Sequence, residues 1–277
     1  MVIYNPKDWF RLIFHFHKSD TFRRLIPVML AVGVFTALVI YVEEEVLHLT
    51  GSNSTVIYQL LGFVISLLLV FRTNTAYDRW WEGRKQWGAL VNASRNAALK
   101  IKHLNKVPEV NRIQSIRWIM LYARVLKHHL RDEKHPEMLS EGHQPNQVAS
   151  DLYQELNQWY EAGYIDGDQL RMLDEELREL TDITGACERI RKTPIPYSYN
   201  IFIKKFIFAY VMAMPFVLMN VYGYGLVPLV MFTLYVLASL ELIAEEIEDP
   251  FGEDSNDLPT DAIAETIGKN LEEIIRS

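Results

Sequence analysis

The stretch that decides the fold runs from Leu60 to Gly88. LLGFVISLLLVF (60–71) is followed without a break by RTNTAYDRWWEGRKQWG (72–88). The first part carries no charge, and the second is dense in charged and aromatic residues. Charged side chains are costly in hydrocarbon, whereas Trp and Arg are favoured at the membrane surface. The stretch therefore predicts a membrane-spanning helix that leaves the bilayer near Arg72, where the chain enters water.

Three long runs of the chain lack any Asp, Glu, Lys, Arg or His. They cover 25–42, 54–71 and 206–240. About 20 apolar residues cross a hydrocarbon core of about 30 Å, so each run can span a bilayer. The last run would be about 52 Å long as one helix, and Asn220–Gly225 (NVYGYG) supplies a turn. We therefore expect four spans, the last two near 203–220 and 226–243.

Basic residues flank these runs on one side only. Lys7, Arg11, Lys18, Arg23 and Arg24 precede the first run, Arg72, Arg79, Arg84 and Lys85 follow the second, and Arg189, Arg191, Lys192, Lys204 and Lys205 precede the third. Lys and Arg near spans are retained in the cytoplasm. Four crossings would place all these clusters there, so we expect both termini and the segment 72–200 to be cytoplasmic.

The polar part of the chain is predicted to be helical. Apolar residues recur at three- and four-residue spacing near 80–105, 109–132, 146–162 and 167–192. No alternating strand pattern of useful length occurs, so the predicted fold is all-α. The expected segments are 1–71 (N-terminal segment and two spans), 72–200 (cytoplasmic helical domain), 201–246 (two spans) and 247–277 (cytoplasmic C-terminal segment).

Composition argues against several classes of function. A formal net charge of −7 leaves no dominant basic face for nucleic acid. The single cysteine, Cys187, rules out an internal disulfide framework. Adjacent His128 and His129 point about 100° apart on a helix, which disfavours shared metal ligation. No motif of a hydrolase, P-loop or zinc protease is present, and spans without ionisable residues favour passive conduction over pumping. We expect neither an enzyme nor a required cofactor.

The second predicted span carries one bulky apolar stripe. Phe63, Leu67 and Phe71 recur at four-residue spacing. A stripe of smaller residues lies beside it: Gly62, Ser66 and Val70. A bulky apolar stripe can line a narrow constriction that gates ions by dewetting. Such stripes also pack against lipid and neighbouring helices, so periodicity alone leaves both interpretations open.

Two polar segments follow spans. The first contains Arg79, Trp80 and Trp81, which are more aromatic and charged residues than membrane anchoring requires. They indicate a functional site, and the alternative is a structural cluster for helix capping and subunit packing. The second segment, 248–257 (EDPFGEDSND), offers carboxylates for a hard cation such as Ca²⁺. It lacks the spacing of an EF-hand, and the alternative is a solvated acidic loop.

These segments together resemble the bestrophin family. An Arg-Trp-Trp after an apolar helix is similar to one hallmark of that family, and PFGED after the fourth span is similar to a second. The residues that carry the two hallmarks are Arg79, Trp80, Trp81, Pro250, Phe251 and Gly252. Ile195–Tyr197 (IPY) looks like the start of the family's third span. The resemblance covers essentially the whole chain. The short length of the chain resembles that of the bacterial members of the family.

The resemblance implies a homopentameric channel with one pore on the fivefold axis. Counting back from the Arg-Trp-Trp places the neck of the pore on Phe63, Leu67 and Phe71, the stripe found by spacing. The resemblance also implies a lower aperture formed by an apolar side chain of the cytoplasmic helices. Ile183 is the first candidate for this aperture and Leu180 the second.

Animal members of the family bind Ca²⁺ through acids that follow Pro-Phe-Gly. Asp254 and Asp257 match two of these positions, whereas Ser255 and Asn256 stand where animal members have Asp. With less negative charge to offset cation dehydration, the sequence predicts weak or absent Ca²⁺ control. Asp254 is expected instead to cap a following helix.

The expected function is passive conduction of small monovalent ions across a bacterial inner membrane. The resemblance indicates anions such as chloride. Cations such as sodium or potassium are the alternative to be considered for the bacterial branch, and the acidic excess favours them. A neck of Phe and Leu carries no formal charge that could decide between them. The expected partners are further copies of the chain, the lipid bilayer and small ions. The rival interpretation is a non-conducting, membrane-anchored helical scaffold or sensor.

Overall fold

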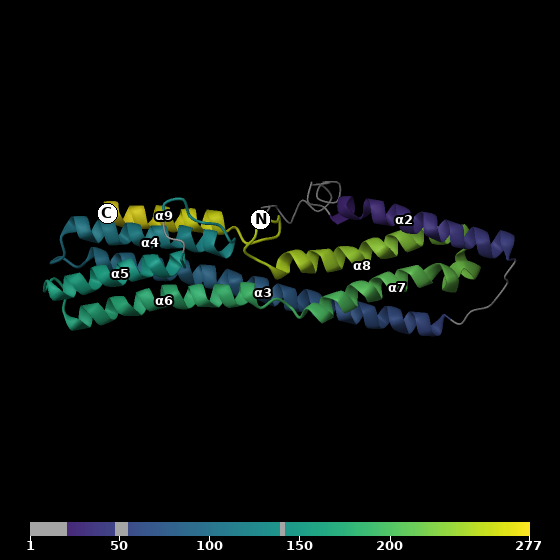
Figure 1. The fold of residues 1–277 in the computed structure, drawn as a ribbon, viewed down its shortest axis with the longest axis horizontal. Coiled ribbons are helices and arrows are strands. Elements are labelled where there is room, and N and C mark those ends of the chain that lie inside the picture. Colours follow the sequence, from purple (N-terminus) through teal and green to yellow (C-terminus); the bar gives the residue numbers. More distant parts are fainter. Residues whose placement is uncertain (1–20, 48–54, 139–141) are drawn as a thin grey trace.

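The structure is a computed structural model that describes residues 21–47, 55–138 and 142–277 (Figure 1). The helices are α2 (Thr21–Tyr41), α3 (Val56–Lys102), α4 (Glu109–Leu130), α5 (Gln144–Glu161), α6 (Gly167–Lys192), α7 (Tyr197–Tyr222), α8 (Leu226–Glu248) and α9 (Thr260–Arg276). A π-helical turn, Val42–Val46, extends α2, and a 3₁₀ turn, Gly223–Gly225, joins α7 to α8. The described residues contain no strand, so this part of the chain is all-α.

The helices form two bundles placed end to end, and α3 runs through both of them (Figure 1). The apolar bundle consists of α2, α7, α8 and the first half of α3. The polar bundle consists of α4, α5, α6, α9 and the second half of α3. The predicted boundary at residue 72 therefore lies inside a continuous helix, which connects the two bundles without a flexible linker.

The apolar bundle is hydrophobic both inside and outside. Ile40, Ile65 and Val230 are buried in its core, yet Val34 on its surface is 68% exposed. Soluble proteins rarely leave large contiguous apolar surfaces in water. Segments long and apolar enough to cross a membrane are Thr21–Val46, Val56–Lys102 and Tyr197–Glu248.

The third of these segments contains the turn predicted at Asn220–Gly225. Gly223 there has a φ of +49°, a conformation that glycine adopts without the steric cost that a side chain would add. The turn ends α7 at Tyr222 and starts α8 at Leu226. The two helices return side by side as a hairpin (Figure 1).

Paired charges lie where the apolar bundle meets the polar bundle. Arg24 at the start of α2 donates a hydrogen bond to Glu246 at 2.8 Å, and Lys204 near the start of α7 donates to Glu245 at 2.8 Å. These basic residues therefore lie at one level of the molecule, beside the end of α8. The basic residues of the sequence pattern that lie outside the described part are Lys7, Arg11 and Lys18.

The polar bundle has the core of a protein in water. Trp87, Tyr122 and Trp159 are fully buried at its centre. α6 begins with a capping box, in which Asp166 accepts a hydrogen bond from the Gln169 amide at 2.8 Å and donates its own amide to the Gln169 side chain at 3.1 Å. The four helices predicted between residues 80 and 192 are all present.

The helix expected after Asp254 is α9, but Asp254 does not cap it. α9 begins only at Thr260, and no side chain accepts a hydrogen bond at its N-terminal cap, Pro259. The capping prediction for Asp254 is therefore wrong. The intervening residues form a compact turn instead, which is described below.

Candidate pore face and junction of the two bundles

One face of α3 is left uncovered by the other described residues of its own chain. Phe63, Leu67 and Phe71 are 67%, 45% and 56% exposed. Ile65 and Leu69 lie on the opposite side of the helix, because two residues turn an α-helix by about 200°, and both are buried in the apolar bundle. The predicted stripe is thus an outward apolar face, open to lipid or to further copies of the chain.

The opposite side of α3 is held tightly against α7. The rings of Tyr58 and Tyr210 stack with centroids 4.3 Å apart, and the Tyr58 hydroxyl donates to the Tyr210 carbonyl at 2.9 Å. A Cβ on Gly62 would lie only 2.6 Å from the Tyr210 hydroxyl oxygen. Glycine at 62 therefore permits this close approach, and the approach fixes which side of α3 faces outward.

Arg72 is fully buried where α3 leaves the apolar bundle. Its guanidinium donates to Glu248 at 2.7 Å and lies 3.6 Å from a carboxylate oxygen of Glu241. Glu248 also accepts the amide N–H of Ile195 at 2.6 Å. A buried ion of one sign requires partners that replace its lost water, and this network joins α3, α8 and the segment before α7.

Arg79, the first residue of the Arg-Trp-Trp, donates hydrogen bonds to backbone carbonyls at the ends of α6 and α8. The acceptors are Ile190 at 2.5 Å, Glu248 at 3.0 Å and Thr193. The last carbonyls of a helix lack intrahelical partners, and a cation there also complements the helix dipole. Arg79 therefore caps two helices, in agreement with the capping alternative.

The two tryptophans of the motif have different surroundings. The Trp80 indole N–H donates to the Asn256 carbonyl at 3.0 Å, so this ring holds the turn after α8 against α3. Trp81 remains 48% exposed and stacks with Tyr77, with ring centroids 6.5 Å apart. Trp80 is thus a contact within the chain, while Trp81 presents an aromatic surface to the outside.

The Pro-Phe-Gly motif docks directly on α3. Phe251 is 1% exposed in the core of the polar bundle. A Cβ on Gly83 of α3 would lie 3.1 Å from Pro250 and 3.2 Å from Phe251, so the absence of a side chain at Gly83 makes room for the motif. The two hallmark segments of the sequence therefore meet in space at the junction.

Asp257 folds back onto the turn that contains it. Its Oδ2 accepts the Asp254 amide at 2.6 Å, while its buried Oδ1 has no hydrogen-bond partner among the described residues. A Cβ on Gly252 would lie 2.7 Å from Oδ2, so only glycine fits there without movement. Burial raises the pKa of Asp257 to about 7.

The same turn offers few side-chain ligands for a Ca²⁺ ion. Ca²⁺ requires six to eight oxygen ligands. Asp254 is exposed, one oxygen of Asp257 is engaged by a backbone amide, and the two belong to no group of three metal-ligating side chains among the described residues.

The structure buries both candidates for the lower aperture. A side chain that forms a pore constriction must be exposed on its own chain, but Ile183 and Leu180 are 2% and 1% exposed in the core of the polar bundle. They lie on the core-facing stripe of α6, and periodicity does not distinguish a core stripe from a pore stripe. The aperture prediction therefore does not fit this structure, and both residues are left out of the proposed pore.

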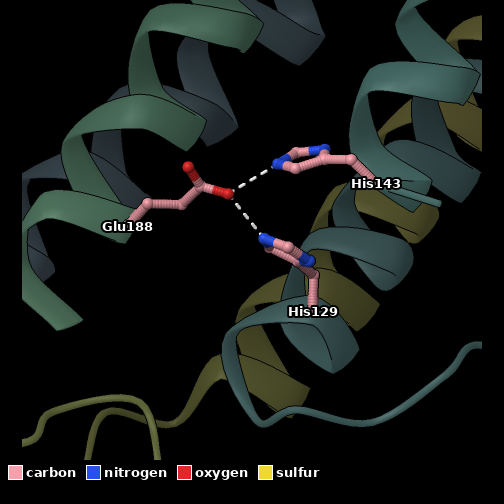
Figure 2. Close-up of side chains that lie close together, drawn as sticks. All are labelled: His129, His143 and Glu188. Carbon is pink, nitrogen blue, oxygen red and sulfur yellow. Dashed lines mark hydrogen bonds and ion pairs between the residues drawn. The ribbon is translucent and has the colours of Figure 1, made fainter. Parts of the chain in front are cut away.

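One cluster was missed in the sequence. His129 of α4, His143 at the N-terminal cap of α5 and Glu188 of α6 converge (Figure 2). The Nε2 atoms of His129 and His143 lie 2.5 and 2.6 Å from the same Glu188 Oε1. Burial pushes the pKa of Glu188 up, but hydrogen bonds from His143 and His129 outweigh it and lower the pKa. His128 turns away to Glu133, at 2.8 Å, as its position beside His129 predicts.

No local spacing could have revealed this cluster, because 59 and 45 residues separate Glu188 from His129 and His143. Only the packing of three helix ends brings these residues together.

Comparison with known proteins agrees with the resemblance seen in the motifs. The sequence pattern of a family described as bacterial/fungal bestrophin protein matches residues 1–273. The voltage-dependent anion channel-forming protein of Nostoc sp. is 34% identical over 97% of this chain and 92% of its own length. The voltage-dependent anion channel-forming protein YneE of Escherichia coli K12 is 29% identical over 98% of this chain and 93% of its own length.

A solved structure has the same fold. A bacterial bestrophin homolog from Klebsiella pneumoniae superposes with a TM-score of 0.84 at 26% identity, over 92% of this chain and 100% of that chain. The relatives are named for channel formation rather than for catalysis, and the apolar segments make this a membrane protein with several spanning helices. The chain belongs to the bacterial and fungal bestrophin family.

Proposed function

We propose that the chain is a subunit of an ion channel in which several copies surround one central pore lined by α3. The observation that carries this proposal is the open apolar face of Phe63, Leu67 and Phe71. This face lies on the helix that passes from the apolar bundle into the polar bundle (Figure 1). A pore along α3 would therefore lead from the membrane into a vestibule built by the polar bundles.

Five copies are the proposed assembly. One helix cannot enclose a water path, whereas closed rotational symmetry produces a pore on the symmetry axis. The pentamer rests on the family resemblance. In such a ring Phe63, Leu67 and Phe71 would form stacked apolar girdles, and narrow apolar girdles exclude water and hence ions. The stripe would then be the main barrier to conduction.

The proposed topology has four crossings in a bacterial inner membrane, made by α2, the first half of α3, α7 and α8. Arg24 and Lys204 lie at the end of the apolar bundle that faces the polar bundle. Because Lys and Arg near spans are retained in the cytoplasm, that end and the whole polar bundle would be cytoplasmic. Both termini would lie on the same side.

Small monovalent anions are the proposed permeant ions. The names of the Nostoc and E. coli relatives support anions. The proposed neck carries no formal charge, so charge beyond it would set selectivity. Asp78 is exposed on α3 and lies seven residues after Phe71, on the same face of the helix. This acid favours cations, and conduction of sodium or potassium is therefore the second candidate.

The proposal is tested with purified protein in planar lipid bilayers under a potassium chloride gradient. We expect discrete channel currents that reverse close to the chloride equilibrium potential. Reversal close to the potassium potential would assign the channel to cations. A correctly assembled protein that carries no current would contradict the channel and favour the membrane-anchored scaffold.

Assembly is tested separately by native mass measurement in detergent. A pentamer has about five times the 32.3 kDa mass of the chain. A monomer that still conducts would contradict a pore shared between copies.

A further inference from the structure

The cluster of His129, His143 and Glu188 has the composition of a metal site. Two imidazoles and one carboxylate are a ligand set that Zn²⁺ takes in proteins, with a water molecule in the fourth position. One ligand atom from each residue lies within 4.8 Å of the other two (Figure 2). Among the described residues this is the only such group of His, Cys, Asp and Glu.

We propose that these three residues bind a divalent transition-metal ion of the zinc class, which would bridge α4, α5 and α6. The ion would bond Nε2 of both histidines and one oxygen of Glu188. The site does not depend on conduction, and it lies in the polar bundle, apart from the proposed neck.

The distances show how far the cluster must open to admit the ion. Tetrahedral Zn²⁺ with bonds of about 2.0–2.1 Å holds its ligand atoms about 3.3 Å apart. The Nε2 atoms of His129 and His143 now lie 2.5 and 2.6 Å from Glu188 Oε1. Each of these contacts must therefore widen by about 0.7–0.8 Å. The side chains are 23%, 32% and 20% exposed, so an ion and its water can reach them.

His143 has a second bond that metal binding would change. Its Nδ1 accepts the Asn146 amide at 3.1 Å and so caps α5. That bond leaves the ring proton on Nε2, which faces Glu188. A metal at Nε2 would move the ring proton to Nδ1, and the cap bond would then be lost. Binding is therefore coupled to the start of α5, and the affinity should be lower than that of a preformed zinc site.

Neighbouring cations also limit the affinity. Lys192 Nζ lies 3.8 Å from Glu188 Oε2, and Arg191 donates to the carbonyl of His129 at 3.2 Å. Both positive charges oppose a divalent cation at short range. They do not occupy the Oε1 atom that both histidines share, so the ligand set itself remains available.

The position of the site suggests a structural effect of the ion. Glu188 lies two residues before Ile190, whose carbonyl accepts a hydrogen bond from Arg79 at 2.5 Å. An ion held between α4, α5 and α6 would therefore fix the end of α6 beside the junction with the apolar bundle. A ligand that binds only the folded state raises its stability, so zinc should raise the melting temperature.

The test is a titration of chelator-treated, purified protein with ZnCl₂, followed by calorimetry and by thermal unfolding, with MgCl₂ as the comparison salt. We expect about one Zn²⁺ per chain and a higher melting temperature, because zinc prefers nitrogen ligands and Mg²⁺ prefers oxygen. Visible absorption of the Co²⁺-loaded protein should report a tetrahedral site. A wild-type protein that binds no stoichiometric Zn²⁺ would overturn the proposal.

The decisive variant is His143→Asn, because asparagine is among the best N-terminal caps and so keeps the start of α5 while it removes the imidazole ligand. We expect its zinc affinity to fall at least about tenfold, while its melting temperature without metal falls only slightly, through loss of the partly exposed hydrogen bond to Glu188. Glu188→Gln should lose zinc affinity in the same way as His143→Asn. His128→Asn, next to the site but bonded to Glu133, is the matched control and should bind normally. Equal zinc binding by His143→Asn and His128→Asn would contradict the site.

Discussion

Close backbone approaches at single residues hold the turn that follows α8. Gly252 lies against the carboxylate of Asp257, and Gly83 lies against the Pro-Phe-Gly motif. The sequence marked Gly252 only as part of a motif. The structure adds the physical reason, because a Cβ there would overlap an oxygen atom that already accepts a backbone amide.

Replacing this glycine should therefore destabilise the folded protein. Gly252→Ala places a Cβ 2.7 Å from Asp257 Oδ2, and overpacking of this kind costs about 1–3 kcal/mol of unfolding free energy. The control is Gly185→Ala in α6, where no atom of the described residues lies within 4 Å of the added Cβ and alanine stabilises a helix by about 0.5–1 kcal/mol. Thermal unfolding in detergent measures both variants. A melting temperature of Gly252→Ala equal to or above that of Gly185→Ala would contradict this packing.

Asp257 should make stability depend on pH. Burial raises its pKa from 3.8 to about 7. Between these values the folded protein keeps a proton that the unfolded chain has released, so this residue's contribution to stability is lost as pH rises from about 4 towards about 7. Asn stays neutral and still offers an acceptor to the Asp254 amide. Asp257→Asn should therefore be more stable than the wild type at pH 8, with a smaller fall between pH 5 and pH 8.

Melting curves over this pH range check the expectation. The control is Asp254→Asn, which removes a minor cause of the raised pKa of Asp257 and leaves its burial, so it should retain most of the fall. An equal loss of stability in the wild type and in Asp257→Asn would show that Asp257 is charged and well solvated in the folded state.

Residue-level prediction from sequence succeeded where a local pattern was sufficient. Phe63, Leu67 and Phe71 share a face because of their spacing, and the structure leaves all three exposed on one chain. The assignment of Ile183 to the lower aperture came from the family resemblance, and it does not fit because this side chain packs in the core of the polar bundle. The cluster around Glu188 could not be predicted, because it arises from packing between distant helices.

At the scale of the helices, Arg79 joins three elements that the sequence places far apart. It lies on α3 and caps the ends of α6 and α8. Sequence patterns predicted these helices and most of their ends, because apolar periodicity, proline and glycine act locally. They did not predict that α3 is continuous across residue 72 or that α9 starts at Thr260, since those features depend on docking between the two bundles.

Arg79→Lys should weaken the junction although it keeps the charge. An ammonium group cannot reproduce the fork of donors that reaches three carbonyls. Hydrogen bonds to charged groups contribute about 1.5–3 kcal/mol each, and partial exposure of Arg79 reduces the total loss to about 1–3 kcal/mol. Arg84→Lys, at an exposed position on the same helix, is the control. Equal melting temperatures of the two variants in detergent would show that the hydrogen bonds of Arg79 do not stabilise the junction.

At the scale of the whole molecule, the two bundles differ in the surface that they present. The apolar bundle presents hydrophobic surface to its surroundings, while the polar bundle keeps its own buried core. A pore shared by several copies would pass from an uncharged neck to charged residues farther along α3. Selectivity and the barrier to conduction should therefore be separable by mutation.

Asp78 tests the first of these two properties. In a ring of copies, one carboxylate per chain on the pore face of α3 raises the local cation concentration and lowers that of anions. Asp78→Asn should shift the reversal potential under a salt gradient towards the chloride equilibrium potential, with a larger shift at low ionic strength. Asp151→Asn on α5, where the residue is partly exposed, is the control. A reversal potential that does not move would place Asp78 away from the ion path.

The barrier itself is the central claim, and single-channel recording of a neck variant tests it most directly. The variant carries Phe63→Ala, Leu67→Ala and Phe71→Ala together. Its control carries three replacements with the same spacing on α2, where the residues are 57%, 68% and 58% exposed: Leu30→Ala, Val34→Ala and Leu38→Ala. Smaller side chains widen and wet an apolar constriction, so the neck variant should show higher conductance or open probability, while the α2 control conducts like the wild type. Unchanged currents from a correctly assembled neck variant would show that this face of α3 contacts lipid and not the pore.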